Sequence, residues 1–219
     1  EIAQCLVGSE MCIRDSTLSG HHSVRSARMR CGRNFFSATL VLILDAYGTM
    51  QTVENTDIMG KKVADQLVET ICRAGIRRIY AVTGDSLNEV NDAVRRAGTV
   101  RWVHMRHEES GAFAAAAEAE LNGIACCAGS SGPGHVHLIN GLYDAHRSNC
   151  SVLAIASTCP SDQFGTGYFQ ETDPIRLFDD CSGYNQMAVT PAQFARMLPA
   201  ALQHAVHKRE VAVVGLPGD

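Results

Sequence analysis

The segment RHEESGAFAAAAEAE, residues 106 to 120, places two adjacent acids where an alanine-rich helix is expected to begin. Acidic residues favour the first turn of a helix because they offset the positive end of its dipole. Successive helical residues point about 100° apart, so one of Glu108 and Glu109 can face water while the other faces inward. A carboxylate in a dry place is costly without a partner, and such an acid is a candidate for acid–base chemistry. This segment alone leaves helix capping and chemistry both open.

The helix that follows these acids carries small side chains around most of its circumference, together with Phe113. We therefore expect it to be covered on several sides rather than to lie on a surface. Other helices and strands of the fold must provide that cover. The small residues concerned are Ala112, Ala115, Ala116 and Ala119.

Six apolar or alternating segments predict strands, and amphipathic segments between them predict helices. Strand and helix alternate with short links, which predicts an α/β fold: a helix-covered parallel sheet of about six strands with right-handed crossovers, forming a single domain. Ser86, with Glu89 three residues later, predicts a helix cap. The expected strands are 77–82, 101–105, 124–129, 151–157, 184–189 and 211–217, and the expected helices are 61–74, 86–97, 107 onward, 135–147, 173–180 and 191–207.

Ligands of such sheets gather at the carboxyl ends of the strands. The loops that matter are then 83–85 (TGD), the approach to Glu108, 129–135 (GSSGPGH) and 157–171. We expect all of them on one edge of the sheet. No histidine or cysteine spacing indicates a metal site, and the HVH at 135–137 is better explained by core or surface histidines.

Composition limits the class of protein. The chain has 219 residues, 46% of them hydrophobic, and a net charge of −4, which is typical of one or at most two globular domains. No basic patch indicates nucleic-acid binding, and the longest apolar stretch, 38–46, is too short to cross a bilayer. The nine cysteines are irregularly spaced, and Cys126 and Cys127 are adjacent in an expected strand. This usage predicts reduced, buried thiols and a cytoplasmic protein.

The first part of the chain does not share this pattern. Residues 5–16, CLVGSEMCIRDS, have no helix or strand period and lack the layout of a secretory signal. They resemble a translated transposase adaptor of the kind used in sequencing libraries. We expect residues 1–58 to be a non-native or disordered leader, with Met59 as initiator and Met50 as the alternative, and 59–219 to be the domain. N-terminal sequencing of the natural protein tests this expectation.

Six motifs, in order, resemble the N-terminal, pyrimidine-binding domain of thiamine diphosphate enzymes, most of all the pyruvate oxidase group with its pyruvate:quinone oxidoreductases. The resemblance covers residues 59–219 without an obvious gap. Any one motif is weak, but six in the right order within one α/β domain are strong. The motifs are VTGDSLN, RHEESGAFAAAAEAE, GSSGPGHVHLINGLYDAHR, VLAIAS, GYFQETDP and LPGD.

The resemblance assigns a catalytic role to Glu108, the acid after RH. In that family this acid hydrogen-bonds a ring nitrogen of the cofactor's aminopyrimidine and favours its imino tautomer, which then deprotonates the thiazolium carbon. The cofactor supplies the carbanion chemistry, and the protein supplies orientation and a shared proton. Glu109 would be the solvated partner that helps the helix to begin.

Other site residues follow from the same resemblance. Gly132, Pro133 and Gly134 resemble a tight turn beside the pyrimidine, although a turn that merely starts a helix explains each of them equally well. Phe169 and Gln170 resemble an aromatic wall and an amide that contact a small 2-oxo acid such as pyruvate, and Phe169 could equally be core. His135 and Ser131 depart from the asparagine and cysteine of quinone-linked relatives, which puts the substrate preference in doubt.

The resemblance also implies parts that the chain does not contain. In the family, a C-terminal domain with a GDG…N motif holds the diphosphate through Mg²⁺, and the oxidases have a middle domain that binds FAD. The active site forms between this domain and the diphosphate domain of a neighbouring subunit. We expect an inactive fragment of a homotetrameric enzyme that is cytoplasmic or, as the full-length parent, peripheral to a membrane, cut at a domain boundary after LPGD.

Three functions remain open at this stage. The first is the oxidative decarboxylation of pyruvate, with electrons passing to a quinone or to oxygen. The second is a carboligase or lyase such as acetolactate synthase, which shares RHE, SGPG and FQETD. The third is a non-catalytic binding module with the same fold. Glu108 argues against the third, because assembly alone does not require a buried acid.

Overall fold

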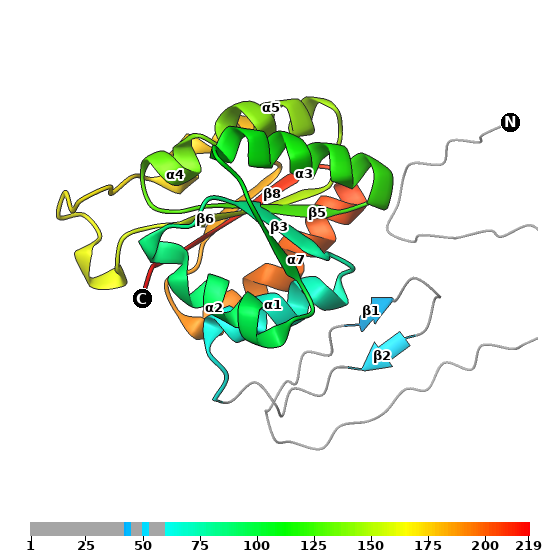
Figure 1. The fold of residues 1–219 in the computed structure, drawn as a ribbon, viewed down its shortest axis with the longest axis horizontal. Coiled ribbons are helices and arrows are strands. Elements are labelled where there is room, and N and C mark those ends of the chain that lie inside the picture. The colour runs from blue at the N-terminus through cyan, green and yellow to red at the C-terminus, as the bar shows by residue number, and fades with distance from the viewer. Residues whose placement is uncertain (1–41, 45–49, 53–59) are drawn as a thin grey trace, which may run out of the picture. The chain divides into compact units, whose positions relative to one another are not determined.

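The computed structural model describes residues 42–44, 50–52 and 60–219. In the last of these ranges, a parallel sheet lies between two layers of helices (Figure 1). Helices α3 and α5, with the short α4, cover one face, and α1, α2 and α7 cover the other. The helices are α1 (Val63–Arg73), α2 (Asn88–Ala97), α3 (Glu108–Asn122), α4 (Pro133–Val136), α5 (Ile139–Arg147), α6 (Pro174–Leu177) and α7 (Pro191–Lys208).

Six strands form this sheet in the order β4-β3-β5-β6-β8-β7, and every neighbouring pair is parallel. The predicted α/β fold with a helix-covered parallel sheet of about six strands is therefore confirmed. The chain order reverses between β3 and β5, so the sheet has a topological switch point there. The strands are β3 (Arg78–Ala81), β4 (Arg101–His104), β5 (Ala125–Gly129), β6 (Val152–Ser157), β7 (Tyr184–Met187) and β8 (Val211–Leu216).

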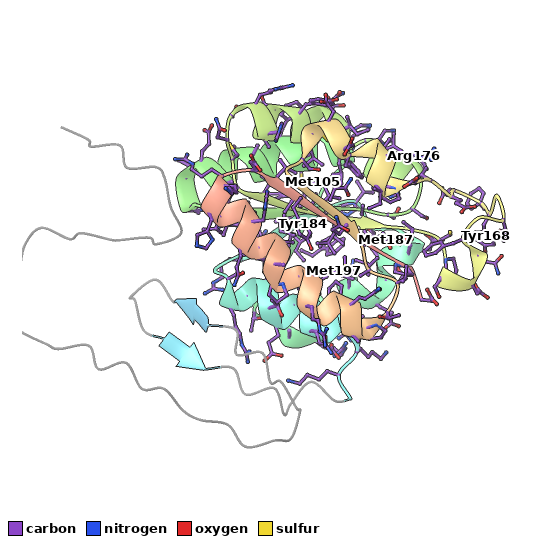
Figure 2. The ribbon with its side chains drawn as sticks, turned by 180° about the vertical axis from the view of Figure 1, so that it is seen from behind. Met105, Tyr168, Arg176, Tyr184, Met187 and Met197 are labelled. Carbon is purple, nitrogen blue, oxygen red and sulfur yellow. The ribbon has the colours of Figure 1, made fainter. Side chains whose placement is uncertain are left out.

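The central strands are buried on both faces because each face has its own core. Along β5, Cys126 and Ala128 pack toward α1, α2 and α7, whereas Cys127 packs toward α3 and α5. Successive strand residues point to opposite faces, so an unbroken apolar run serves both cores. Seen from behind, α7 lies over the sheet, where the Tyr184 hydroxyl donates to the Met197 carbonyl at 3.5 Å (Figure 2).

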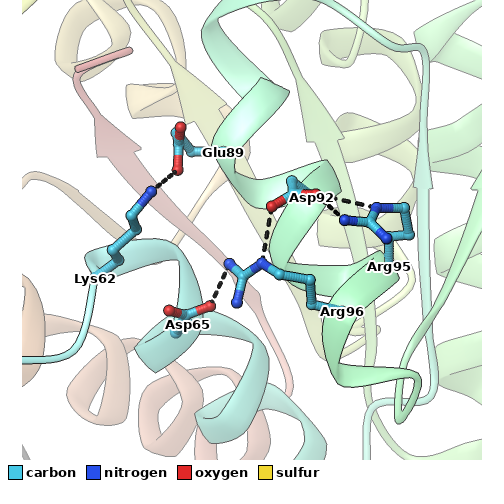
Figure 3. A network of polar contacts seen from close by, with 6 residues as sticks. All are labelled: Lys62, Asp65, Glu89, Asp92, Arg95 and Arg96. Carbon is cyan, nitrogen blue, oxygen red and sulfur yellow. Dashed lines mark hydrogen bonds and ion pairs between the residues drawn. The ribbon is translucent and has the colours of Figure 1, made fainter.

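Exposed ion pairs join α1 to α2 (Figure 3). The Arg96 guanidinium contacts Asp65 of α1 at 2.6 Å and Asp92 of its own helix at 2.8 Å. Lys62, just before α1, contacts Glu89 of α2 at 2.9 Å. Water screens these charges, so each pair stabilises the fold only weakly.

Two expectations about helix starts are wrong. Ser86 does not cap α2: it lies in a 3-10 turn, and its hydroxyl accepts the Ser131 N–H at 2.9 Å instead. The helix expected at 135–147 begins at Pro133 and is divided into α4 and α5. Proline has no N–H to lose and a fixed φ, which suits the first turn.

Helix α3 is buried on one side only, whereas we expected it to be buried on several sides. Its buried residues form one stripe at helical spacing, while Phe113 on the opposite side is 41% exposed. Alanine is nearly neutral in hydropathy, so an alanine-rich sequence does not reveal which face is inside. The buried residues are Glu108, Gly111, Ala112, Ala115, Ala116 and Ala119.

Residues 1–58 contain the short antiparallel pair β1 (Leu42–Leu44) and β2 (Met50–Thr52), in a segment left out of the fold prediction. The adaptor-like residues 5–16, Met59 and the rest of the expected leader lie outside the described residues. The described cysteines are all free, as expected, and burial raises the pKa of Cys127 to about 12. No helix among the described residues is long and apolar enough to cross a membrane.

Candidate functional site

The loops after β3 and β5 meet at the switch point of the sheet. A Cβ added to Gly84, after β3, would clash with the side chain of Ser130, so glycine alone allows this approach. Ser86 then joins the loops through its bond to Ser131, and its carbonyl accepts the Ser157 hydroxyl at 2.7 Å. The expected gathering of loops at one sheet edge is therefore present.

Glu108 is the first residue of α3 and lies at this edge with 8% of its surface exposed. Its Oε2 lies 3.1 Å from Nδ1 of His137, which is exposed. The side chain of Glu109 is 38% exposed, and its N–H donates to Nδ1 of the N-cap residue His107 at 3.3 Å. The two acids therefore differ in their surroundings: Glu108 is enclosed, whereas Glu109 is partly exposed and helps the helix to begin.

The backbone of the SGPG turn passes directly beside Glu108. A Cβ on Gly134 would lie 3.6 Å from Glu108 Oε1 and 2.7 Å from the Ser130 hydroxyl. Among the described residues, Oε1 accepts no hydrogen bond, whereas Oε2 faces His137. Oε1 of Glu108 thus lies beside the backbone of Gly134, which carries no side chain. Pro133, the residue before it, is exposed and begins α4.

Gln170 closes the other side of this turn. It has φ +60°, a left-handed conformation that is rare for a residue with a side chain. Ser131 Oγ donates to its Oε1 at 3.2 Å, and a Cβ on Gly132 would lie 2.7 Å from its Cβ. Strained residues of this kind cluster at functional sites. Phe169 is 74% exposed, so the core alternative for it is wrong.

His135 fastens the loop that carries Gln170. Its ring is fully buried, with Nδ1 2.8 Å from the Ser157 carbonyl and Nε2 2.5 Å from the Thr172 hydroxyl. A carbonyl only accepts, so Nδ1 carries the proton and Nε2 accepts from Thr172. Burial lowers the pKa of His135, which keeps the ring neutral in this role.

The comparison with family models is decisive. Residues 61–177, more than half of the chain, match the model described as thiamine pyrophosphate enzyme, N-terminal TPP binding domain. The chain belongs to the thiamine pyrophosphate enzymes. The matched range contains Glu108, the SGPG turn and the loop with Gln170.

Individual relatives of this TPP enzyme domain differ in their activities. An uncharacterized 42.6 kDa protein of Pseudomonas amyloderamosa is 56% identical over 72% of the chain. The pyruvate oxidase of Lactiplantibacillus plantarum is 34% identical over 78%, and acetolactate synthase 3 of Brassica napus is 33% identical over 73%. The chain spans only 40%, 28% and 25% of the lengths of these three proteins.

The site residues of this TPP domain fit the pyrimidine half of the cofactor. A flat ring needs a hydrogen-bonding group at its edge and room for close approach of the backbone. The Oε1 of Glu108 offers the hydrogen-bonding group, and the backbone of Gly134 passes beside it, packed against Ser130. Burial of Glu108 also removes competing water from the carboxylate.

Two features of the site escape sequence reasoning. His137 lies 29 residues from Glu108 in the chain, and only the turn through α4 brings its ring to the carboxylate. Glu171 follows the predicted substrate residues, and its carboxylate accepts the N–H groups of Gly165, Gly167 and Tyr168. The FQE motif contains Glu171, but its role depends on loop geometry. Figure 2 shows Tyr168 at the outer end of this loop.

We expect this loop to loosen in acid. The N–H of Gly165, followed by those of Gly167 and Tyr168, lowers the pKa of Glu171. A lowered pKa in the folded state stabilises the loop above the ordinary glutamate value of about 4.3. That stabilisation is lost as the pH falls through the folded value. Hydrogen exchange at these three amides should therefore accelerate, beyond its intrinsic pH dependence, as the pH falls below about 4.3.

The variant Glu171→Gln should show the same loosening already at neutral pH, because the amide carries no charge. Asp162→Asn is the matched control, since Asp162 is an exposed acid of the same loop. Equal protection of the three amides in native protein and Glu171→Gln would contradict this role of Glu171.

Gly132→Ala tests the contact with Gln170. Gly132 has φ +61°, and its new Cβ would lie 2.7 Å from the Gln170 Cβ. Backbone strain together with this clash should lower the free energy of unfolding by about 2–3 kcal/mol. Gly123→Ala is the control: φ is +87° with nothing within 4 Å, so it should cost only about 1–2 kcal/mol. Equal costs, measured by urea unfolding, would show that Gln170 yields freely.

Proposed function

We propose that this chain binds the pyrimidine half of thiamine diphosphate and presents Glu108 to its ring nitrogen. The observation that carries the proposal is the enclosed carboxylate at the start of α3, with Oε1 beside the bare backbone of Gly134. When bound, the cofactor supplies a carbanion that attacks a 2-oxo acid. Glu108 holds and returns a proton at the ring nitrogen, and the glycines set how closely the ring approaches.

The complete protein is, in this proposal, an oxidoreductase of the pyruvate oxidase type. Pyruvate loses CO₂, and the remaining two-carbon unit is oxidised while a quinone or oxygen takes two electrons; its acetyl group passes to water, giving acetate, or to inorganic phosphate, giving acetyl phosphate. In this proposal, Phe169 and Gln170 line the substrate site. Mg²⁺, FAD, a diphosphate domain of a neighbouring subunit and a tetrameric assembly belong to the same proposal. The similarity to a pyruvate oxidase, over 78% of the chain, supports it.

An acetolactate synthase is the second candidate, because a relative of that activity is nearly as similar, at 33% against 34%. The complete protein, supplied with pyruvate, thiamine diphosphate, Mg²⁺, FAD and a quinone, separates the two. Formation of acetate with reduction of the quinone supports the oxidase, and acetolactate without reduction supports the synthase. If neither product forms and thiamine diphosphate does not bind, the result supports the third function, a non-catalytic binding module.

A further inference from the structure

Three side chains with metal-binding atoms meet at the start of α3. His107, Glu108 and His137 place one ligand atom each within 4.8 Å of one another. The two imidazole rings are stacked, with centroids 4.4 Å apart and planes inclined by 27°. Between Glu108 and His137 the distance is already 3.1 Å. The cluster combines two chain segments that sequence spacing does not connect.

The ligand types and distances suit a transition metal ion. Two imidazoles and one carboxylate are a common set for Zn²⁺, which leaves a fourth position open. In tetrahedral zinc sites, ligand atoms lie roughly 3.3 Å apart, since each is about 2.0–2.1 Å from the metal. The Glu108 and His137 pair meets this spacing. Both histidines are nearly half exposed, so their rings can turn to complete it.

Glu109 provides an outer partner for this set. Its Oε2 lies 3.9 Å from Nδ1 of His107. Metal-binding histidines commonly donate their other N–H to a carboxylate, which fixes the ring and its tautomer. A small rotation of the exposed His107 ring would exchange its contact with the Glu109 N–H for this carboxylate.

We propose that His107, Glu108 and His137 form a binding site for a divalent transition metal ion, with Zn²⁺ as the preferred ion. The proposed function assigns Oε1 of Glu108 to the pyrimidine ring, whereas the ion would bind through Oε2, beside His137. A metal ligand must be deprotonated, so a bound ion would oppose the proton-holding role of this carboxylate, and zinc would lower the turnover of the complete enzyme under the proposed function. The site itself does not depend on the proposed function, because the ligand atoms are all protein groups.

Calorimetric titration of the full 219-residue chain with Zn²⁺, without cofactor, tests the site. We expect a binding event at this site that weakens at least about tenfold in His137→Asn, since even loss of an outer partner costs about 10- to 100-fold. Among the described residues, the side chain of His137 hydrogen-bonds only Glu108, so this variant should fold normally. His107→Asn should weaken zinc binding to a similar extent, and asparagine remains a good helix N-cap.

His104→Asn is the matched control, because His104 is an exposed histidine at the end of β4 that lies outside the cluster. Its zinc affinity should equal that of the native chain. His21 and His22 also belong to the full chain, and their contribution cancels when variants are compared. Equal zinc binding by native protein, His107→Asn and His137→Asn would overturn the proposal, and so would the lack of any binding event in the native chain. Neither result would bear on Glu108 as a partner of the pyrimidine.

Discussion

Glu108→Gln in the complete enzyme is expected to lower the turnover of pyruvate by about 10²- to 10⁴-fold, the usual contribution of a general acid or base. Glutamine keeps the size of the side chain and can accept the contact from His137, but it cannot exchange a proton with the cofactor ring. Because Glu108 is enclosed, bulk water has little access to replace it. The expected loss is therefore in the rate of catalysis rather than in folding.

Two measurements separate this role from a structural one. Proton exchange at the thiazolium carbon of the bound cofactor should slow to a similar extent as turnover, while the free energy of unfolding should change little. Glu109→Gln is the matched control, since Glu109 is the next acid on the same helix and its side chain is 38% exposed, against 11% for Glu108. Unchanged proton exchange in Glu108→Gln, or an equal loss of turnover in Glu109→Gln, would refute the assignment.

The sequence predicts the sheet well because each buried strand is a short apolar run between turn residues. The run at Ala125–Gly129, for example, is buried at every position, and so is Val152–Ser157. Neither run has a helical length, and both faces of a parallel sheet demand apolar side chains. The order of strands and their register depend on long-range pairing, which a local pattern does not encode.

The site is predicted less completely than the sheet. Glu108 and the SGPG turn stand out through the resemblance to the family, whereas their residue types alone also suit an ordinary helix start. His137 does not stand out, since an exposed histidine on a helix has many ordinary explanations. Ser86 has the sequence of a helix cap, yet a tertiary partner, the N–H of Ser131, takes its hydroxyl. Local capping rules fail at this point because the two loops at the switch point share one hydrogen bond.

Phe178→Ala is expected to lower the free energy of unfolding by about 3–5 kcal/mol, as for other buried phenylalanines. Phe178 is fully buried in the core between the sheet and α5, so removal of its ring leaves a cavity there. Its ring also lies 5.9 Å from that of His135. The cavity should therefore loosen His135 and its bond to Thr172 as well. Urea unfolding of the chain measures the free energy.

Phe169→Ala is the matched control, because the same atoms are removed from a side chain that is 74% exposed. Its unfolding free energy should change by less than about 0.5 kcal/mol. An aromatic ring exposed to water contributes little to the free energy of folding. Stability therefore does not explain the ring of Phe169 beside Gln170, and the proposed function explains it by contact with a substrate. In the complete enzyme, Phe169→Ala should then raise the KM for pyruvate without loss of stability. Equal destabilisation by the two substitutions would show that Phe169 is packed in solution and would remove this argument for a substrate role.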